Sequence, residues 1–284
     1  MISILNNLFK KKKKKLGLAL GSGGAKGMAH VGILRAFDEE GISFDCVAGT
    51  SIGSVIGAMY AAGYSSASMI KYLDELDFFA AQTIVKLTLT GKSVEDIFGD
   101  VIGGSSFEDL LIPFAAVATD LKTGDEVVIK SGSVAKAMRA SSAIPPVLKP
   151  ASVDGKILID GAYVNSVPSD VVKNMGADIV IGVNLSAHLP FNDQIKATLD
   201  EKYPDNGVKI CDRAMAGRVY SDVLLTPDLH GYSSATVSKT KLNEMYEIGY
   251  ETAKSKMSEI TDLLKKQSIC LNGKAESKEQ VIRE

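Results

Sequence analysis

Short apolar runs alternate with segments of helical periodicity in the first part of the chain. The run LGLAL at 16 to 20 leads into a glycine-rich turn, and apolar residues then recur at helical spacing from 28 to 37. The same order follows a second time, because FDCVAG at 44 to 49 precedes another helical face from 52 to 59. The pattern therefore predicts two consecutive units of strand, turn and helix.

The rest of the chain continues this alternation. Further strands are predicted at 114 to 119, 126 to 130, 156 to 160, 178 to 185 and 222 to 226. Further helices are predicted at 66 to 78, 133 to 142, 168 to 175, 207 to 220 and 238 to 266. Short buried strands that alternate with helices usually pair in parallel through right-handed crossovers. We therefore expect an α/β fold, a three-layer sandwich with a mainly parallel central sheet covered by helices on both faces.

Three segments depart from the alternation. Residues 186 to 206 lack a clean period, which is typical of a mobile segment or a lid rather than a linker between domains. The tail from 269 to 284 is polar and charged, so we expect it to be disordered. Residues 1 to 15 form an arm that is first apolar and then rich in lysine. The sequence thus predicts one α/β domain over 16 to 268, between this arm and the tail.

The composition excludes several classes of protein. A chain of 284 residues that is 45% apolar can bury a substantial core. Its formal charge of −2 gives no sign of a general affinity for nucleic acid. The cysteines, Cys46, Cys211 and Cys270, are too few and too unpatterned for a disulfide framework or a metal cage. Such cysteine usage is typical of a reducing compartment, so we expect a cytoplasmic protein.

The N-terminal arm combines an apolar stripe with a block of positive charge. Ile2, Leu5, Leu8 and Phe9 have helical spacing, and lysines fill positions 10 to 15. This combination would allow peripheral contact with an anionic membrane at its inner face, although a solvated arm explains the same pattern. The charge follows the apolar residues, which is the reverse of a secretory signal. No apolar stretch approaches the roughly 20 residues that span a bilayer, so the sequence predicts at most a peripheral protein.

The glycine-rich loop GSGGAKG at 21 to 27 could bind an anion. It lacks the spacing of a nucleotide-binding P-loop, because Lys26 is followed by glycine rather than by serine or threonine. The dinucleotide pattern G-x-G-x-x-G fails as well. What remains is a set of backbone N–H groups at Gly23, Gly24 and Ala25, which the start of a helix would expose to an oxyanion. A tight turn that needs glycine for packing alone is the other interpretation.

Ser51 lies between Gly49 and Gly53 in the sequence GTSIG, with an apolar strand before it and an apolar helix after it. This is the context of a nucleophile elbow, in which a sharp turn lifts a serine hydroxyl clear of the sheet. Glycines two residues before and after the serine relieve crowding in such a turn, and the N-terminus of the next helix favours developing negative charge. A serine that only caps the helix is the alternative.

A serine hydroxyl needs a base to become an effective nucleophile. Asp160 is the favoured candidate because it ends the strand KILID, where open α/β sheets place their sites, although aspartate there can also be a simple turn former. His188 and His230 are rivals, and the order Ser51, Asp160, His188 would match an α/β-hydrolase triad. That fold builds several strands before its elbow, whereas here a single strand precedes the strand of Ser51. His30 lies inside the first helix and is interpreted as structural.

Four longer segments occur in an order and spacing that point to a known family. They are LALGSGGAKGMAHVGIL, GISFDCVAGTSIGSVIGAMYAAG, MRASSAIPPVLKP and ILIDGAYVNSVP. Together, over residues 16 to 186, they resemble the bacterial branch of the patatin-like phospholipase family. The resemblance fades across 187 to 284.

The resemblance implies a serine acyl hydrolase with a Ser-Asp dyad and no histidine. Ser51 would attack the ester carbonyl of a phospholipid or lysophospholipid, and Asp160 would accept its proton. The N–H groups of Gly23, Gly24 and Ala25 would form the oxyanion hole. Supporting positions would be Gly21, Lys26, Gly27 and Gly161, and a rigid wall with Pro145 and Pro146 would lie beside the site. The reaction would need neither a metal nor an organic cofactor.

One position departs from the family pattern, and three other functions remain as alternatives. Many members of the family carry arginine where this chain has Lys26, which weakens any bidentate grip on phosphate but does not imply loss of activity. A non-catalytic lipid-binding or regulatory module of the same fold is one alternative function. A Ser-His-Asp esterase that uses His188 or His230 is another, and nucleotide binding at the glycine loop is the least favoured.

Overall fold

A computed structural model describes residues 14 to 75, 93 to 145, 148 to 186, 193 to 209 and 212 to 269. The strands are β1 (Leu16–Leu20), β2 (Cys46–Thr50), β3 (Phe114–Asp120), β4 (Glu126–Ile129), β5 (Ala151–Val153), β6 (Lys156–Asp160), β7 (Ile179–Val183) and β8 (Val223–Leu225). The α-helices are α2 (Met28–Glu39), α3 (Ile52–Ala61), α4 (Ser66–Glu75), α6 (Val94–Val101), α7 (Val134–Ser141), α8 (Ser169–Asn174), α9 (Asp193–Lys202) and α10 (Lys239–Lys266). Short 3-10 helices are η1 (Gly24–Gly27), η2 (Phe107–Asp109), η3 (Gly161–Tyr163) and η4 (Asp212–Tyr220).

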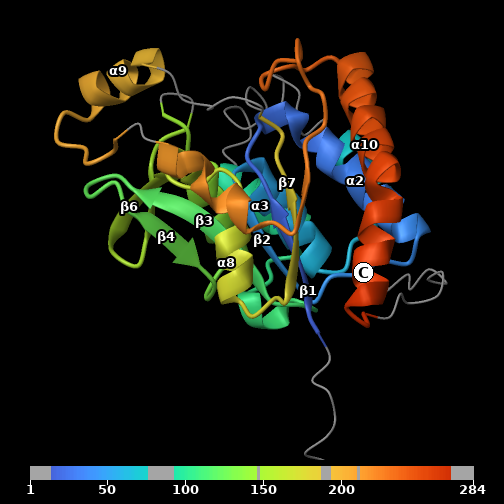
Figure 1. The fold of residues 1–284 in the computed structure, drawn as a ribbon. Coiled ribbons are helices and arrows are strands. Elements are labelled where there is room, and N and C mark those ends of the chain that lie inside the picture. Colours follow the sequence, from blue (N-terminus) through green and yellow to red (C-terminus); the bar gives the residue numbers. More distant parts are fainter. Residues whose placement is uncertain (1–13, 76–92, 146–147, 187–192, 210–211, 270–284) are drawn as a thin grey trace, which may run out of the picture.

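The strands form one sheet in the order β5-β6-β3-β2-β1-β7-β8, and β4 pairs with β3 outside this path (Figure 1). Parallel pairs join β1 to β2, β1 to β7, β2 to β3 and β7 to β8. Antiparallel pairs join β3 to β4, β3 to β6 and β5 to β6. The predicted α/β sandwich is therefore confirmed, and its sheet is mixed because antiparallel strands extend the parallel part on one side.

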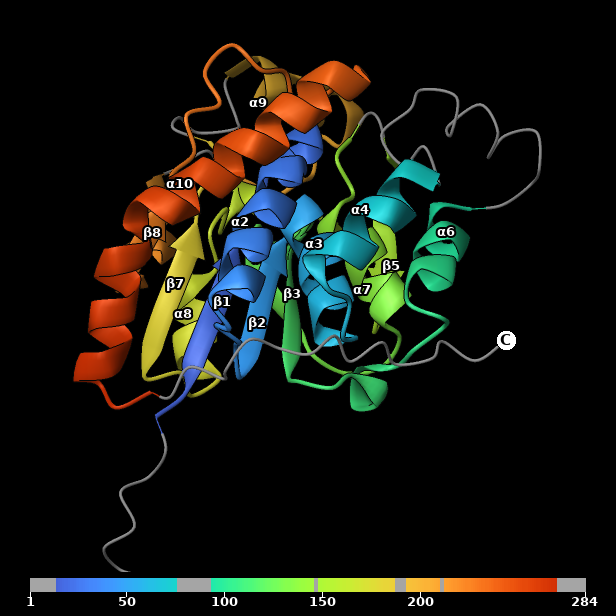
Figure 2. The same cartoon turned by 90° about the vertical axis from the view of Figure 1, so that its right-hand side faces the viewer.

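Alternate residues of the central strands enter two different core layers. Leu18 and Val47 belong to a large cluster that includes side chains of α2, α3 and α10. Ala19 and Ala48 belong to a smaller cluster with Val171 of α8. Figure 2 shows α2, α3, α4 and α10 covering the near face of the sheet, with α8 on the far side. A parallel sheet that is buried on both faces requires such continuous apolar strands, which is why LGLAL shows no polar alternation.

The predicted strands all have counterparts in the described chain, but some other expectations fail. Residues 186 to 206, interpreted as a mobile segment or a lid because they lack a clean period, contain the helix α9 (Asp193–Lys202). Leu199 of α9 is buried beside Ile159 and Tyr163. A single buried apolar residue does not produce the helical periodicity by which the sequence could have indicated this helix. The predicted helix at 207 to 220 is instead the shorter 3-10 segment η4.

Two predicted segments fall almost entirely outside the described residues. These are the N-terminal arm, 1 to 15, and the tail, 269 to 284. Within the described ranges, no helix has the length and apolar character needed to cross a membrane.

The long helix α10 packs along α2, and two glycines set how closely the helices approach (Figure 2). A Cβ atom on Gly32 of α2 would collide with the carbonyl oxygen of Tyr246. A Cβ atom on Gly249 of α10 would collide with the carbonyl oxygen of Ala29. The obstacle in both cases is backbone, which cannot rotate away as a side chain can. The contact therefore depends on glycine at both positions.

We predict that Gly32→Ala lowers the free energy of unfolding by about 1 to 3 kcal/mol, because the two helices must separate to admit the methyl group. Gly99→Ala is the matched control, since Gly99 is also helical but nothing lies within 4 Å of its Cβ position. The control should be neutral or stabilising by up to about 1 kcal/mol through helix propensity. Urea unfolding of both variants tests this, and equal stabilities would contradict the proposed close contact.

Candidate active site

Ser51 occupies a strained turn between β2 and α3. Its backbone angles are φ 56° and ψ −126°, which is a conformation that residues with a side chain rarely adopt. The Ser51 side chain makes no capping hydrogen bond to α3, so the alternative of a simple helix cap does not describe it. The residue is 5% exposed. This geometry is the one expected of a nucleophile elbow.

Glycines allow the elbow to pack against its neighbours. A Cβ on Gly53 would collide with the carbonyl oxygen of Leu20, at the end of β1. A Cβ on Gly27 would collide with the side chain of Ile52, the first residue of α3. Gly49 similarly faces the carbonyl oxygen of Gly53. The absence of side chains at these positions brings the glycine loop and the start of α3 together.

Asp160 ends β6, and the pairing of β3 explains why it lies close to Ser51. Thr50 of β2 pairs with Val117 of β3, and Asp160 pairs with the next residue, Ala118. Strand β4 pairs with residues of β3 that also pair with β2 or β6, so β4 must occupy the opposite edge of β3. Consequently β2 and β6 lie end to end along the same edge of β3.

The direction of β6 explains how Asp160 reaches the elbow. Asp160 ends its strand, as expected, but this strand belongs to the antiparallel part of the sheet, because β6 runs antiparallel to β3. The strand therefore approaches the carboxyl end of β2 from outside and stops where the elbow begins. Gly161 permits the following turn, because a Cβ there would collide with the carbonyl oxygen of Val117.

The carboxyl group of Asp160 is completely buried. Its Oδ1 accepts a hydrogen bond of 2.8 Å from the N–H of Ala162, so the turn-forming role considered for this residue is real. Its Oδ2 has no partner of full hydrogen-bond geometry within the described residues. Burial raises the pKa of Asp160 to about 7, against smaller opposing effects from the Ser51 hydroxyl and the Ala162 amide. The Ser51 hydroxyl lowers this pKa in the way a donor beside a carboxylate does.

The glycine loop is held firmly before Gly23. The N–H of Gly21 donates to the Val183 carbonyl at 3.0 Å, and the N–H of Ser22 donates to the Ser166 carbonyl at 2.9 Å. The hydroxyls of Ser22 and Ser166 share a further hydrogen bond of 2.7 Å. Ser166 follows Asp160 closely in the chain, so these bonds fix the loop relative to the segment that carries the carboxylate.

The backbone N–H groups of this loop are not equivalent. Those of Gly23 and Gly24 have no partner in the described part of the chain, and both remain available to an anion. The N–H of Ala25, expected as a third donor, instead donates to the Ser234 carbonyl at 2.8 Å. The same carbonyl would collide with a Cβ on Gly24. Lys26 is half-buried in η1.

Neither of the described histidines, His30 and His230, is hydrogen-bonded to Ser51 or Asp160. His30 is fully buried, and its Nε2 bonds to the Gly21 carbonyl at 2.8 Å. Burial lowers the pKa of His30 to about 4, so the ring is neutral near pH 7 and donates from Nε2. His230 is exposed on the loop before α10. His188 lies outside the described residues.

Sequence reasoning missed several small polar residues around the site. Ser141 accepts a hydrogen bond of 2.9 Å from the N–H of Ser51 through its Oγ. Ser22 and Ser166 anchor the glycine loop, as described above. All three occur inside the quoted motifs, where a hydroxyl within an otherwise apolar, small-residue stretch was the available signal. The segment containing Ser141, interpreted as a rigid wall, therefore also contacts the elbow directly.

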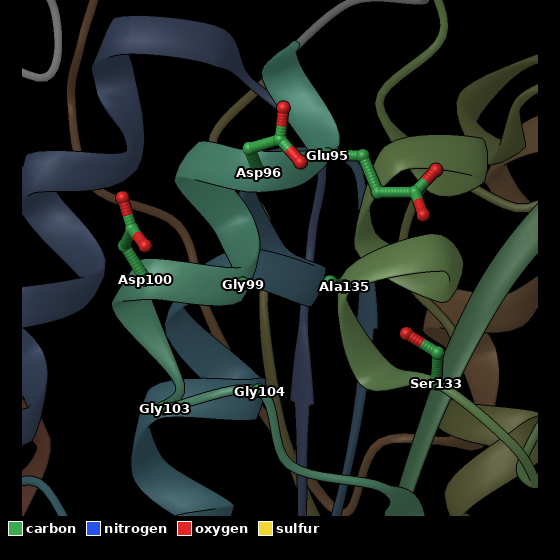
Figure 3. A pocket seen from close by; sticks show the side chains of 8 residues that line it. All are labelled: Glu95, Asp96, Gly99, Asp100, Gly103, Gly104, Ser133 and Ala135. Carbon is green, nitrogen blue, oxygen red and sulfur yellow. The ribbon is translucent and has the colours of Figure 1, made fainter. Parts of the chain in front are cut away.

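A separate acidic pocket of about 710 Å³ lies between α6 and the start of α7 (Figure 3). Its lining includes Glu95, Asp96, Asp100 and Ser133. It shares no residue with the elbow, the carboxylate or the glycine loop. Among the described residues, no three His, Cys, Asp or Glu side chains are grouped so that they could hold a metal ion.

Comparison with known proteins identifies the family of this chain. The model of the family described as patatin-like phospholipase matches residues 18 to 173, which is more than half of the chain. The chain belongs to the patatin-like phospholipase family. The matched residues of this patatin-like chain contain the glycine loop, Ser51 and Asp160.

Relatives of this patatin-like chain occur in bacteria and animals. An uncharacterized NTE family protein of Mycobacterium tuberculosis is 37% identical over 185 residues, which cover 61% of this chain and 49% of the relative. Patatin-like phospholipase domain-containing protein 6 of Homo sapiens is 35% identical over 189 residues, which cover 61% of this chain and 13% of that protein. The chain therefore spans about half the length of the mycobacterial relative. It spans a much smaller part of the human one.

One solved structure resembles this patatin-like chain over more residues than the family model matches. VipD from Legionella pneumophila superposes with a TM-score of 0.54 at 16% identity. The alignment covers 88% of this chain and 67% of VipD. At this identity the comparison supports the fold alone.

We predict that Asp160→Asn stabilises the protein at alkaline pH. The folded pKa of about 7 exceeds the usual value of about 3.9 in an unfolded chain, so proton binding favours the folded state. This contribution is complete below about pH 4 and is lost as the pH rises through 7. At pH 8 the variant should be more stable than the wild type by on the order of 2 to 4 kcal/mol, because the amide does not ionise.

Urea unfolding at pH 5 and pH 8 measures this difference, which should shrink at the lower pH. Asp154→Asn is the matched control, because Asp154 is exposed to solvent. The control should change the free energy of unfolding by no more than about 0.5 kcal/mol, as surface substitutions usually do. An Asp160→Asn variant less stable than the wild type at both pH values would contradict the cost assigned to the buried carboxylate.

Proposed function

We propose that the protein hydrolyses acyl esters of phospholipids or lysophospholipids through Ser51 and Asp160. The observation that carries the proposal is the meeting of a strained serine elbow with a fully buried carboxylate at the junction of β2 and β6. A buried carboxylate is costly to a fold, so its retention beside an elbow serine is readily explained by a role in proton transfer. Membership of the patatin-like phospholipase family supports lipid esters as the substrate class.

In the first step, the Ser51 oxygen forms a bond to the acyl carbonyl carbon while its proton moves to Asp160. The carbonyl oxygen becomes an oxyanion, which the N–H groups of Gly23 and Gly24 are available to bind. The intermediate then collapses and expels the alcohol part of the lipid, which takes the proton from Asp160. An acyl ester of Ser51 remains.

In the second step, water attacks the acyl ester while Asp160 accepts a proton from it. Collapse of the second intermediate releases the fatty acid, and the proton on Asp160 returns to the Ser51 oxygen. A carboxylate with a pKa raised to about 7 suits both directions of transfer better than an ordinary aspartate would. The low exposure of both residues strengthens each electrostatic interaction because water is excluded.

The remaining expectations belong to the same proposal. Contact of residues 1 to 15 with an anionic membrane would bring the site to its lipid substrate, and a cytoplasmic location at the inner face fits this role. Ala25 could join the oxyanion hole only after its N–H leaves the Ser234 carbonyl.

We predict that Ser51→Ala and Asp160→Asn each reduce kcat/KM for ester hydrolysis by about a thousandfold or more, because each removes one member of a unit that acts together. The measurement is fatty acid release from phosphatidylcholine and lysophosphatidylcholine, followed by mass spectrometry. A fluorophosphonate probe should label the wild type at Ser51 and leave Ser51→Ala unlabelled.

His230→Ala should retain wild-type activity, since His230 lies exposed and apart from the elbow contacts. His188→Ala tests the remaining triad alternative in the same assay. Activity lost with either histidine would favour the Ser-His-Asp esterase, because the proposed dyad uses no histidine. A folded wild type that neither reacts with the probe nor releases fatty acid would favour the non-catalytic module.

We predict that kcat/KM rises with pH through a midpoint near 7, because Asp160 must be ionised to accept the proton of Ser51. Below the midpoint, activity should fall about tenfold for each pH unit, as for a single essential base. An uncharged ester substrate avoids titration of the substrate itself. A profile that is flat between pH 5 and pH 8 would contradict the assignment of Asp160 as the base.

A further inference from the structure

The turn that ends α7 contacts the backbone of both proposed catalytic residues. The N–H of Ser51 donates to Ser141 Oγ at 2.9 Å. The N–H of Asp160 donates to the Ala143 carbonyl at 2.9 Å. Ser141 and Ala143 are both fully buried and lie two residues apart in the chain. A short buried segment therefore contacts the backbone of both residues.

The hydroxyl of Ser141 accepts a hydrogen bond from a backbone N–H of the elbow. At φ 56° the Ser51 backbone has left the ladder of β2, and as the residue before α3 it has no helical partner for its N–H. A buried N–H without an acceptor would be costly. Ser141 Oγ accepts this bond and donates its own proton to the Val117 carbonyl at 2.6 Å. The hydroxyl thus ties the elbow to β3.

Strand β3 is also the strand that fixes the carboxylate. Asp160 pairs with Ala118, the residue after Val117, and its carbonyl accepts a hydrogen bond of 2.8 Å from Thr119 Oγ1. The carbonyl of Ser51, in turn, is held by the hydroxyl of Ser54 at 2.7 Å. Both the N–H and the carbonyl of Ser51 and of Asp160 are therefore hydrogen-bonded. Ser141 links the Ser51 backbone to β3, the strand that pairs with Asp160.

We infer that Ser141 is a positioning residue, which holds the Ser51 backbone so that the serine oxygen stays in line with the Asp160 carboxylate. The inference rests on the proposed function and adds to it a residue that acts through another rather than on the substrate. A loss of this contact would leave both reacting groups present but would let the elbow relax away from its strained geometry. A small misplacement of reacting atoms is enough to slow a reaction strongly.

The test is the Ser141→Ala variant, for which we expect kcat to fall about 10-fold to 100-fold with KM changed less than threefold. The pH profile provides a readout that a merely structural role would not change. Because the Ser51 hydroxyl lowers the pKa of Asp160, a displaced hydroxyl should move the acid limb of kcat/KM to higher pH.

Ser142→Ala is the matched control. Ser142 is the next residue in the same turn, and its buried Oγ has no hydrogen-bond partner among the described residues. Removal of this hydroxyl should leave kcat and the acid limb as in the wild type. If Ser141→Ala does not fold, Ser141→Cys replaces it, because a thiol keeps the shape and bonds only weakly. The Ser141→Cys variant should show a smaller fall in kcat and a smaller shift of the acid limb than Ser141→Ala.

The outcomes separate this inference from the proposed function. Folded Ser141→Ala protein with wild-type kcat and an unchanged acid limb of the kcat/KM profile would overturn the positioning role. The proposed function would still hold in that case, provided that hydrolysis depends on Ser51. An equal loss in Ser142→Ala would overturn it as well, since the effect would then belong to the turn in general. A wild type without Ser51-dependent hydrolysis would overturn both.

Discussion

A carboxylate buried against a serine hydroxyl imposes the main constraint on this fold. The pKa of Asp160 is raised because burial removes water, and the opposing contributions come from the Ser51 hydroxyl and the Ala162 amide rather than from a cation. Such a group disfavours the folded state once it ionises. The surrounding structure therefore has to hold the carboxylate in place through backbone contacts, and the pairing of β6 with β3 does so.

The end-to-end placement of β2 and β6 explains how two residues 109 positions apart come together. Each strand pairs with β3, and Val117 and Ala118 are consecutive residues of that strand. The position of each reacting group is thus defined relative to the same rigid element rather than by flexible loops. Precise placement on regular structure is what proton transfer between two side chains without an intervening ring requires.

Small residues make this placement sterically feasible. Gly53 allows the start of α3 to approach the backbone of β1, and Gly27 allows the glycine loop to pack on the side chain of Ile52. Hydroxyl side chains then satisfy the polar backbone groups that such close packing buries. Ser141 does this for the elbow, and Ser22 does it with Ser166 for the glycine loop. Serine suits these positions because it combines a small volume with both a donor and an acceptor.

The sequence by itself determined the apolar strands, the two units of strand, turn and helix, and the positions of Ser51 and of Asp160 at a strand end. These features follow from local periodicity and from glycine spacing, which act over a few residues. Only the tertiary structure decided that β6 runs antiparallel, that Ser234 occupies the N–H of Ala25, and that Ser141 supports the elbow. Each of these depends on a contact between distant segments, and the local pattern of a strand or turn is the same whichever partner it meets.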